Sequence, residues 1–179
     1  KHTWNGSYAS PVLGELHGKP RVLVFAGGMT KPPHGGLLSI DPANGKIDDA
    51  FPWRARMFAS VNAASPVIVG NSVFITEGYT EGGAMIEFSA ELKASKGWTA
   101  PRFASQFSTP VFHEGHLYGF SGSSVNGGEL VCYDAKTGKE KWRDGTDLST
   151  PQGRALWGRG SLLHACLLYT SPSPRDSDQ

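Results

Sequence analysis

The chain has 179 residues, with 17 Lys and Arg against 16 Asp and Glu, 23 glycines and 12 prolines. The balanced, scattered charges make no basic stripe of the kind that binds nucleic acid, and no apolar run approaches the roughly eighteen residues of a membrane-spanning helix. A charged fraction of only 18%, together with many turn-forming residues, indicates a domain of short strands.

Three copies of a short motif containing Pro-Val open the predicted units. They read ASPVL at 9–13, ASPVI at 64–68 and STPVF at 108–112. A proline is tolerated as the first residue of a strand, because that residue need not donate to the ladder of hydrogen bonds. Each copy therefore predicts a strand. A tight turn then leads to a second apolar strand, predicted at 21–27, 72–78 and 116–122.

A longer pattern completes each unit: a glycine pair, an apolar strand, a polar turn and a strand that carries a Trp. It reads GGLLSIDPANGKIDDAFPW at 35–53, GGAMIEFSAELKASKGW at 82–98 and GGELVCYDAKTGKEKW at 127–142. With the Pro-Val motif, each unit holds four short strands. The period is about 45–55 residues, which lies within the range of propeller blades.

The turn in the first and third units has a defined chemistry. Asp41 and Asp134 are predicted to accept hydrogen bonds from backbone N–H groups two residues further on. Gly45 and Gly138 are predicted to supply the positive φ that such a turn requires. The middle unit has Ser89 in place of the Asp and no matching glycine, so an irregular hairpin is expected there.

The tryptophans are predicted to hold the units together. A four-stranded sheet cannot bury both of its faces alone, and a large flat indole fills the gap to the next sheet. Trp53, Trp98 and Trp142 end the three units, and replacing any of them by Ala is expected to cost about 3–5 kcal/mol. Trp4 and Trp157 precede strand starts, and we expect them in the core rather than at a ligand-binding rim.

The predicted fold is therefore all-β: a β-propeller fragment of about three four-stranded antiparallel blades in an open arc. The arc is expected to be open because propellers usually close with four to eight blades. The partial propeller covers 1–165, with blades at about 8–58, 59–103 and 104–150 and the start of a fourth at 151–165.

The stretch 166–179 is treated separately. It contains CLLYTSPSPRD, which resembles the in-frame translation of a transposase adapter used in sequencing libraries. A genuine Ser/Pro-rich linker would have a similar composition. We expect this tail to be disordered, and we set it aside in predicting the fold.

No catalytic or metal-ligating group is predicted. His113, Glu114 and His116 lie close together, but they fall on a predicted hairpin turn, and their spacing is not that of a zinc-protease helix. The Gly-Lys pairs lack the other residues of a phosphate-binding loop. Cys132 has hydrophobic neighbours and is expected to be a buried, inert thiol.

The repeated turn and Trp resemble a known family. LVCYDAKTGKEKW and LLSIDPANGKIDDAFPW are similar to the pyrroloquinoline-quinone (PQQ) repeat, and the Pro-Val strands resemble its outer-membrane-assembly, BamB-like branch. The resemblance covers residues 8 to 165. It implies a β-propeller of seven or eight blades, a non-catalytic protein-binding or scaffolding role with protein or peptide partners, no cofactor, and a periplasmic or outer-membrane-associated location.

Two alternatives stay open at this point. The first is a fragment of a PQQ-dependent alcohol or sugar dehydrogenase; relatives of that type hold the quinone above Ca²⁺ and carry an adjacent cysteine pair, which this sequence lacks. The second is a kelch-like interaction module, which also uses paired glycines and a late Trp. Blades outside this sequence could hold the dehydrogenase site, so the fold alone does not decide between an enzyme and a scaffold.

Overall fold

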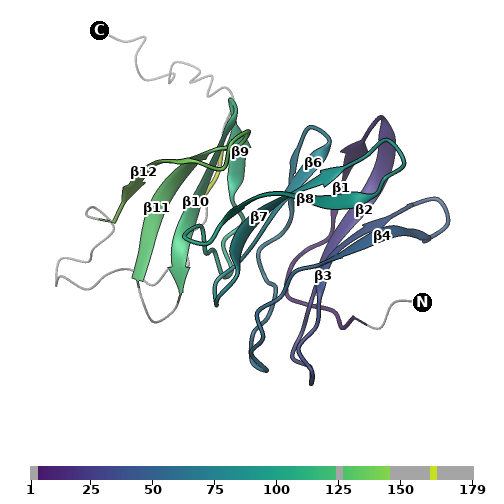
Figure 1. Cartoon of the computed structure of the whole chain (residues 1–179), viewed down its shortest axis with the longest axis horizontal. Helices are drawn as coiled ribbons and strands as arrows, with labels where there is room; N and C mark the ends of the chain where they lie inside the picture. Colours follow the sequence, from purple (N-terminus) through teal and green to yellow (C-terminus); the bar gives the residue numbers. More distant parts are fainter. Residues whose placement is uncertain (1–3, 124–126, 146–161, 165–179) are drawn as a thin grey trace, which may run out of the picture.

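The computed structural model describes residues 4–123, 127–145 and 162–164. In this part of the chain, twelve strands form three four-stranded sheets (Figure 1). The first sheet holds β1 (Val12–Leu16), β2 (Lys19–Ala26), β3 (Gly36–Ile40) and β4 (Ile47–Pro52). The second holds β5 (Val67–Val69), β6 (Ser72–Glu77), β7 (Gly82–Phe88) and β8 (Ala94–Ala100). The third holds β9 (Val111–His113), β10 (His116–Ser123), β11 (Gly127–Asp134) and β12 (Glu140–Asp144).

Every sheet is an antiparallel meander in which each strand pairs with its neighbours in sequence. The three sheets stand side by side in chain order, from the β1–β4 sheet at one end to the β9–β12 sheet at the other (Figure 1). The predicted all-β fold of four-stranded blades in an open arc is confirmed. Among the residues described, no helix has the length and apolar character needed to cross a membrane.

The Pro-Val motifs mark the start of each sheet. β1, β5 and β9 begin directly after Pro11, Pro66 and Pro110, so each proline precedes the ladder and costs it no donor. The predicted second strands are also present, with ends that differ by one or two residues. β2 starts early because only His17 and Gly18 separate it from β1.

Two hydrophobic clusters fill the spaces between the sheets. The first joins Leu23 and Phe25 of the first sheet to Val73 and Ile86 of the second, and all four are fully buried. The second joins the second and third sheets. At its centre is Phe103, whose ring centroid lies 4.9 Å from that of Phe74 and 5.0 Å from that of Tyr133. The facing sides of neighbouring sheets are therefore buried by packing against each other.

The middle hairpin differs from the other two, and the register of β7 against β8 shifts between Ala84 and Ile86, as expected of an irregular hairpin. The Ser89 N–H donates to Lys93 O at 3.0 Å, four residues further on, whereas the Asp41-to-Lys46 and Asp134-to-Lys139 bonds of the other sheets span five residues. The Ser89 hydroxyl accepts from the N–H groups of Glu91 and Lys93 at 3.3 Å each, and the bond from Glu91, two residues further on, replaces the bond that the carboxylate accepts in the other turns. Leu92 adopts the positive φ, at 61°, and its side chain is buried in the first cluster. This burial offsets the cost of the left-handed backbone.

The connections between strands lie at two ends of the sheets. The turns that join the first strand to the second and the third strand to the fourth in each sheet are at one end. The segments at the other end, 27–35, 53–66, 78–81 and 101–110, are called here the connection end. The first two lie along the lower side of Figure 1.

Candidate interaction surface and pocket

The predicted turn residues lie in the hairpins opposite the connection end. Asp41 Oδ1 accepts from the N–H of Ala43 at 2.9 Å, as an Asx turn requires. Asp134 Oδ1 accepts from both the N–H and the hydroxyl of Thr137, at 2.9 Å each, and the hydroxyl bond is the main cause that lowers the pKa of Asp134. Gly45 and Gly138 have φ values of 72° and 69°. In both sheets the turn residues bond to their own hairpin and line no pocket of the connection end.

Trp98 and Trp53 both reach the following sheet. Trp98 Nε1 donates to Ala135 O at 3.1 Å, and a methyl group at Gly138 would lie 2.5 Å from Cε3 of the same indole. Trp53 Nε1 donates to Gly82 O at 3.3 Å. Ala135 follows β11, whereas Gly82 begins β7, so the two indoles contact opposite ends of their neighbours.

The three tryptophans are not equivalent in register. Trp53, Trp98 and Trp142 follow the turn lysine of their hairpins by seven, five and three residues. Trp53 was predicted to lie on the fourth strand of its unit. In the structure it lies just beyond β4, which ends at Pro52. Among the described residues, Trp142 is 43% exposed and has Tyr118, at 6.1 Å between ring centroids, as its aromatic neighbour. The following blade, against which Trp142 was predicted to pack, lies outside the described residues apart from 162–164, so the buried wedge stays a prediction for Trp142.

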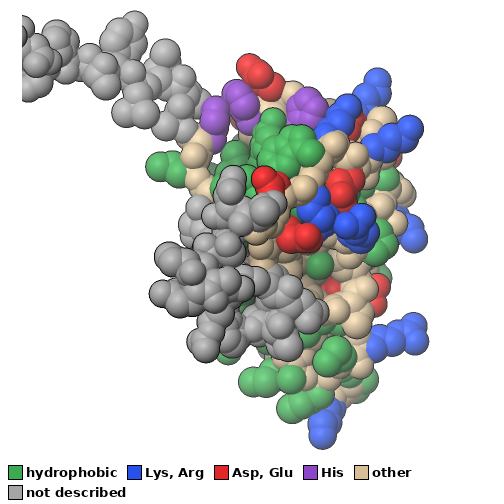
Figure 2. All heavy atoms as spheres, turned by 90° about the vertical axis from the view of Figure 1, so that its left-hand side faces the viewer, with side chains coloured by type: hydrophobic (Ala, Val, Ile, Leu, Met, Phe, Trp, Pro, Cys, Tyr) green, Lys and Arg blue, Asp and Glu red, His purple; other side chains and the backbone are tan. Residues whose placement is uncertain are grey.

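Trp142 is exposed because of the face on which it lies. Tyr118, Cys132 and Trp142 are register partners across β10, β11 and β12, on the face turned away from the second sheet. Figure 2 looks onto this face, where hydrophobic side chains gather below the histidines. Cys132 is buried, as predicted, and burial raises the pKa of its thiol.

Residues 162–164 lie against the same face. With side chains of β9, β10 and β11 they line a cavity of about 200 Å³, and the rings of His113 and His164 are 3.9 Å apart. The start of a fourth blade was predicted at 151–165, and apart from 162–164 this segment lies outside the described residues. Trp157 and the tail 166–179 also lie outside them.

At the connection end, Arg54 joins two segments. It is 9% exposed, and its guanidinium donates to Gly28 O, to His34 O at 3.2 Å, to Ser60 O and to Ser60 Oγ at 3.0 Å. Burial lowers the pKa of Arg54, but a guanidinium remains charged at neutral pH. These charge-assisted bonds tie the β2–β3 connection to the β4–β5 connection.

Glu77 fixes the connection between β6 and β7. Its side chain is fully buried at the end of β6, and the carboxylate accepts backbone N–H groups from the whole turn to β7. The donors are Tyr79 and Thr80 at 2.8 Å, Gly82 at 3.2 Å, and Glu81. A buried carboxylate satisfied by several backbone donors fixes the shape of this turn.

Further hydrogen bonds connect neighbouring connections. The Tyr79 hydroxyl donates to Ala59 O at 3.4 Å and accepts from Gln106 Nε2 at 2.9 Å, so the β4–β5, β6–β7 and β8–β9 connections touch. Thr76 Oγ1 donates to Phe103 O at 2.8 Å and accepts from the N–H of Ser105 at 3.0 Å. The connection end is therefore a rigid layer that spans all three sheets.

This rigid layer carries exposed apolar side chains. Met29 is 54% exposed, Met57 and Phe58 are each 49% exposed, and Phe107 is 40% exposed. The Lys31 ammonium lies 4.8 Å from the centroid of the Phe58 ring, which joins the β2–β3 segment to the β4–β5 segment. These four apolar side chains, with Lys31, are called here the connection-end surface.

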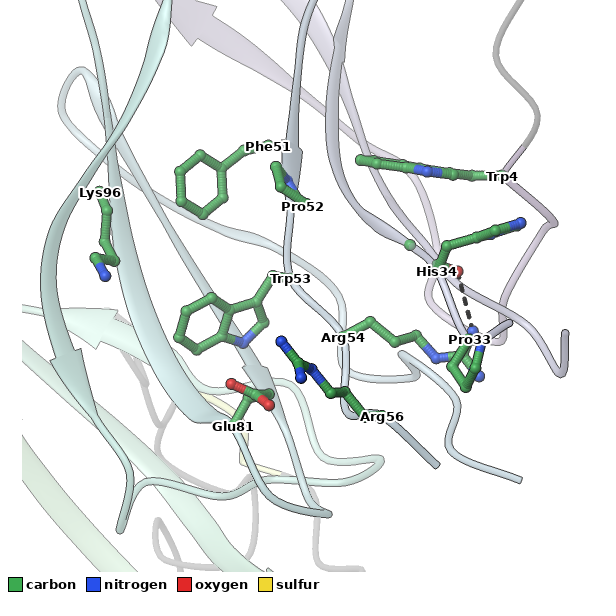
Figure 3. A pocket seen from close by; sticks show the side chains of 11 residues that line it. Trp4, Pro33, His34, Phe51, Pro52, Trp53, Arg54, Arg56, Glu81 and Lys96 are labelled. Atoms are coloured by element: carbon green, nitrogen blue, oxygen red, sulfur yellow. Dashed lines mark hydrogen bonds between the residues drawn. The ribbon is translucent and has the colours of Figure 1, made fainter. Parts of the chain in front are cut away.

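Beside this surface is a pocket of about 640 Å³ between the first and second sheets (Figure 3). Its walls include the rings of Trp4, His34, Phe51 and Trp53, all half-buried. Trp4 was predicted to lie in the core, and the structure places it instead at the rim, beside His34 (Figure 3). Four aromatic rings at one pocket give a large apolar contact area with polar edges.

The pocket also has an excess of positive charge. Arg54, Arg56 and Lys96 line it, against the single carboxylate of Glu81. Arg54 is occupied by backbone carbonyls, whereas Arg56 and Lys96 are exposed and form no ion pair or hydrogen bond within the described residues. In the view of Figure 3, the Trp53 indole lies between the side chains of Arg56 and Lys96.

The sequence reasoning did not predict Arg54, Arg56, Glu77 or Lys96. Glu77 carried a signal: it ends an apolar strand at a buried position of the alternation and precedes a short turn. Arg56 and Lys96 carried none, because they lie in different units and meet only when the two sheets pack.

The described residues contain no group of three or more His, Cys, Asp and Glu side chains arranged to hold a metal ion. His113 ends β9, Glu114 lies in the turn and His116 begins β10, in agreement with the predicted hairpin turn. The His113 and Glu114 side chains are 3.7 Å apart. The donors in this part of the chain therefore do not fit the calcium of a quinoprotein.

The fold and the repeated turns agree with a comparison against protein families. The family model described as outer membrane protein assembly factor BamB matches residues 5–144. The chain belongs to this family. The BamB match covers all three sheets, the connection-end surface and every residue that lines the pocket except Trp4. A search of the curated proteins found no match.

Proposed function

We propose that this BamB-family propeller is a non-catalytic module that binds another protein through its connection-end surface. The observation that carries the proposal is the combination of exposure and rigidity. Met29, Met57 and Phe58 are about half exposed, yet the two segments that present them are tied together by the hydrogen bonds of Arg54. Exposed apolar side chains on a pre-organised surface favour association, because little conformational freedom is lost on binding.

The chemistry of the surface suits a protein partner. Methionine side chains adapt to irregular apolar surfaces, and the Phe58 ring adds a flat anchor. The name of the family supports an extracytoplasmic location, at the periplasmic side of an outer membrane, and a partner among the proteins assembled there. Both inferences belong to this proposal.

Photo-crosslinking tests the proposal directly. A photoreactive benzoylphenylalanine is placed at Met57 in the full chain, and a control chain carries it at Phe112, which is 37% exposed near the hairpin end of the third sheet. After irradiation with an envelope extract, a discrete crosslinked protein is expected from the Met57 position only. Phe58→Asp should abolish it, because an unpaired charge would then be buried in the interface. Equal products from both positions would contradict the proposal.

A second measurement separates binding from catalysis. The purified chain is incubated with PQQ and Ca²⁺ and assayed for dye reduction with alcohols and sugars. Turnover under these conditions would refute the non-catalytic role and favour the dehydrogenase alternative. With the proposed role, dye reduction stays at the level of the protein-free control.

A further inference from the structure

We propose that the pocket between the first and second sheets binds an acidic peptide segment of the partner, in which carboxylates are flanked by apolar or aromatic residues. This inference rests on the proposed protein-binding function and names the chemistry of the partner. The pocket is not part of the connection-end surface but adjoins it, because Arg56 lines the pocket and directly precedes Met57 and Phe58.

Charge is the first step of the argument. Arg56 and Lys96 come from different sheets, and both are exposed and unpaired within the described residues. Among the residues that the structure describes, Glu81 supplies the one carboxylate that lines the pocket, so the pocket has an excess of positive charge. Such a cleft attracts a carboxylate-bearing ligand, and low-dielectric aromatic walls strengthen the attraction.

The aromatic walls are the second step. The rings of Trp4 and Phe51 face the pocket beside Trp53 (Figure 3). Aromatic walls favour apolar, aromatic or proline side chains next to the charge. A free inorganic anion would leave these rings uncovered, whereas a peptide covers them and reaches both cations.

The shape of the site is the third step. β4 is the outermost strand of the first sheet and lacks a further partner strand there, and Phe51 and Pro52 at its end belong to the pocket. A volume of about 640 Å³ holds a few side chains of an extended segment. The segment can continue from the pocket onto Met57, so one partner chain would contact both areas.

The test uses the full chain and a labelled synthetic peptide in which two glutamates flank a Pro-Phe pair. Binding is followed by fluorescence anisotropy. A matched peptide with glutamines in place of the glutamates is expected to bind about tenfold more weakly. Arg56→Glu and Lys96→Glu should each weaken binding of the acidic peptide about tenfold, and raising the salt concentration should weaken it further.

Lys139→Glu is the matched control. Lys139 is exposed in the β11–β12 turn, its substitution changes the net charge equally, and it lies away from the pocket. It should leave the affinity within about twofold. Circular dichroism melts verify that all three variants fold. Equal binding of the two peptides, no binding of either, or equal effects of the three substitutions would overturn the proposal.

The crosslinking experiment distinguishes this failure from failure of the proposed function. If Arg56→Glu and Lys96→Glu leave the Met57 crosslink at full yield, the connection-end surface binds the partner and the pocket does not contribute. If the acidic peptide binds as expected but Met57 gives no specific crosslink, the pocket is a binding site and the proposed use of the connection-end surface is wrong.

Discussion

Gly45 and Gly138 occupy matching turns but have different surroundings, which gives a sharp test of how the sheets are held together. Both glycines precede the turn lysine and have φ near 70°. A methyl group at Gly45 would meet nothing within 4 Å, whereas one at Gly138 would overlap the Trp98 indole. Replacing either glycine by Ala therefore adds the same backbone contribution to the free energy of unfolding. Only the replacement at Gly138 also adds a cost from side-chain overlap.

The expected magnitudes follow from these two terms. An alanine at a left-handed position costs about 1 kcal/mol, so Gly45→Ala should lower the free energy of unfolding by that amount. Gly138→Ala has the same backbone cost and also overpacks the Trp98 ring, which costs about 1–3 kcal/mol more. Its total cost should therefore be about 2–4 kcal/mol. Trp98→Ala alone should cost about 3 kcal/mol, from lost burial and the bond to Ala135 O.

Urea unfolding followed by far-ultraviolet circular dichroism measures all three variants and the double variant Trp98→Ala/Gly138→Ala. In the double variant the overlap is gone, so Gly138→Ala should cost only about 1 kcal/mol more than Trp98→Ala alone. If Gly45→Ala and Gly138→Ala are equally destabilising, or if the effects of Trp98→Ala and Gly138→Ala are additive, then Trp98 does not pack on the turn as described.

Three further predictions concern single side chains of the second and third sheets. Trp142→Ala should cost only about 1 kcal/mol in urea unfolding, because this indole is 43% exposed; a loss as large as for Trp98→Ala would mean that another segment covers it. Glu77→Gln should lower the free energy of unfolding by about 2–3 kcal/mol, because the amide NH₂ group would face backbone N–H groups that need an acceptor. The 78–81 turn should then be cleaved faster by proteases, and cleavage at the same rate as in the parent chain would contradict this. Burial, then the hydrogen bond to Glu140, raises the pKa of Tyr133 to about 12, above the value near 10 in an unfolded chain. The unfolded chain therefore loses this proton first, and stability should fall as the pH rises from 10 to 12; Tyr133→Phe should reduce this dependence, and an unchanged slope would refute the assignment.

The repeat allowed the fold to be predicted because each of its signals is local. A proline before a strand, an Asp that accepts from its own turn, and a glycine at positive φ all act within a few residues. Pro11, Asp41 and Gly138 therefore have the places that their sequence context indicates. Ser89 shows where the local reasoning was incomplete, because a hydroxyl replaces the carboxylate and the buried Leu92 replaces the glycine.

The register of the tryptophans and the pocket could not be predicted in the same way. Each depends on contacts between units, and these are set by how far one sheet is displaced along the next. Arg54 donates to carbonyls that are far from it in sequence, and Arg56 and Lys96 line one pocket although they are 40 residues apart. The sequence of one unit shows a hydrogen-bond donor such as Arg54, but it does not show which distant carbonyl groups accept from it.

The uneven placement of the indoles limits how the gene can be rearranged. Trp98 fits against Gly138, but in the second sheet the corresponding turn position is filled by Leu92, which faces the first sheet. A chimera with the blades reordered would bring an indole onto a leucine, or leave a glycine uncovered. Recombination within this gene should thus preserve adjacent pairs of blades rather than single ones.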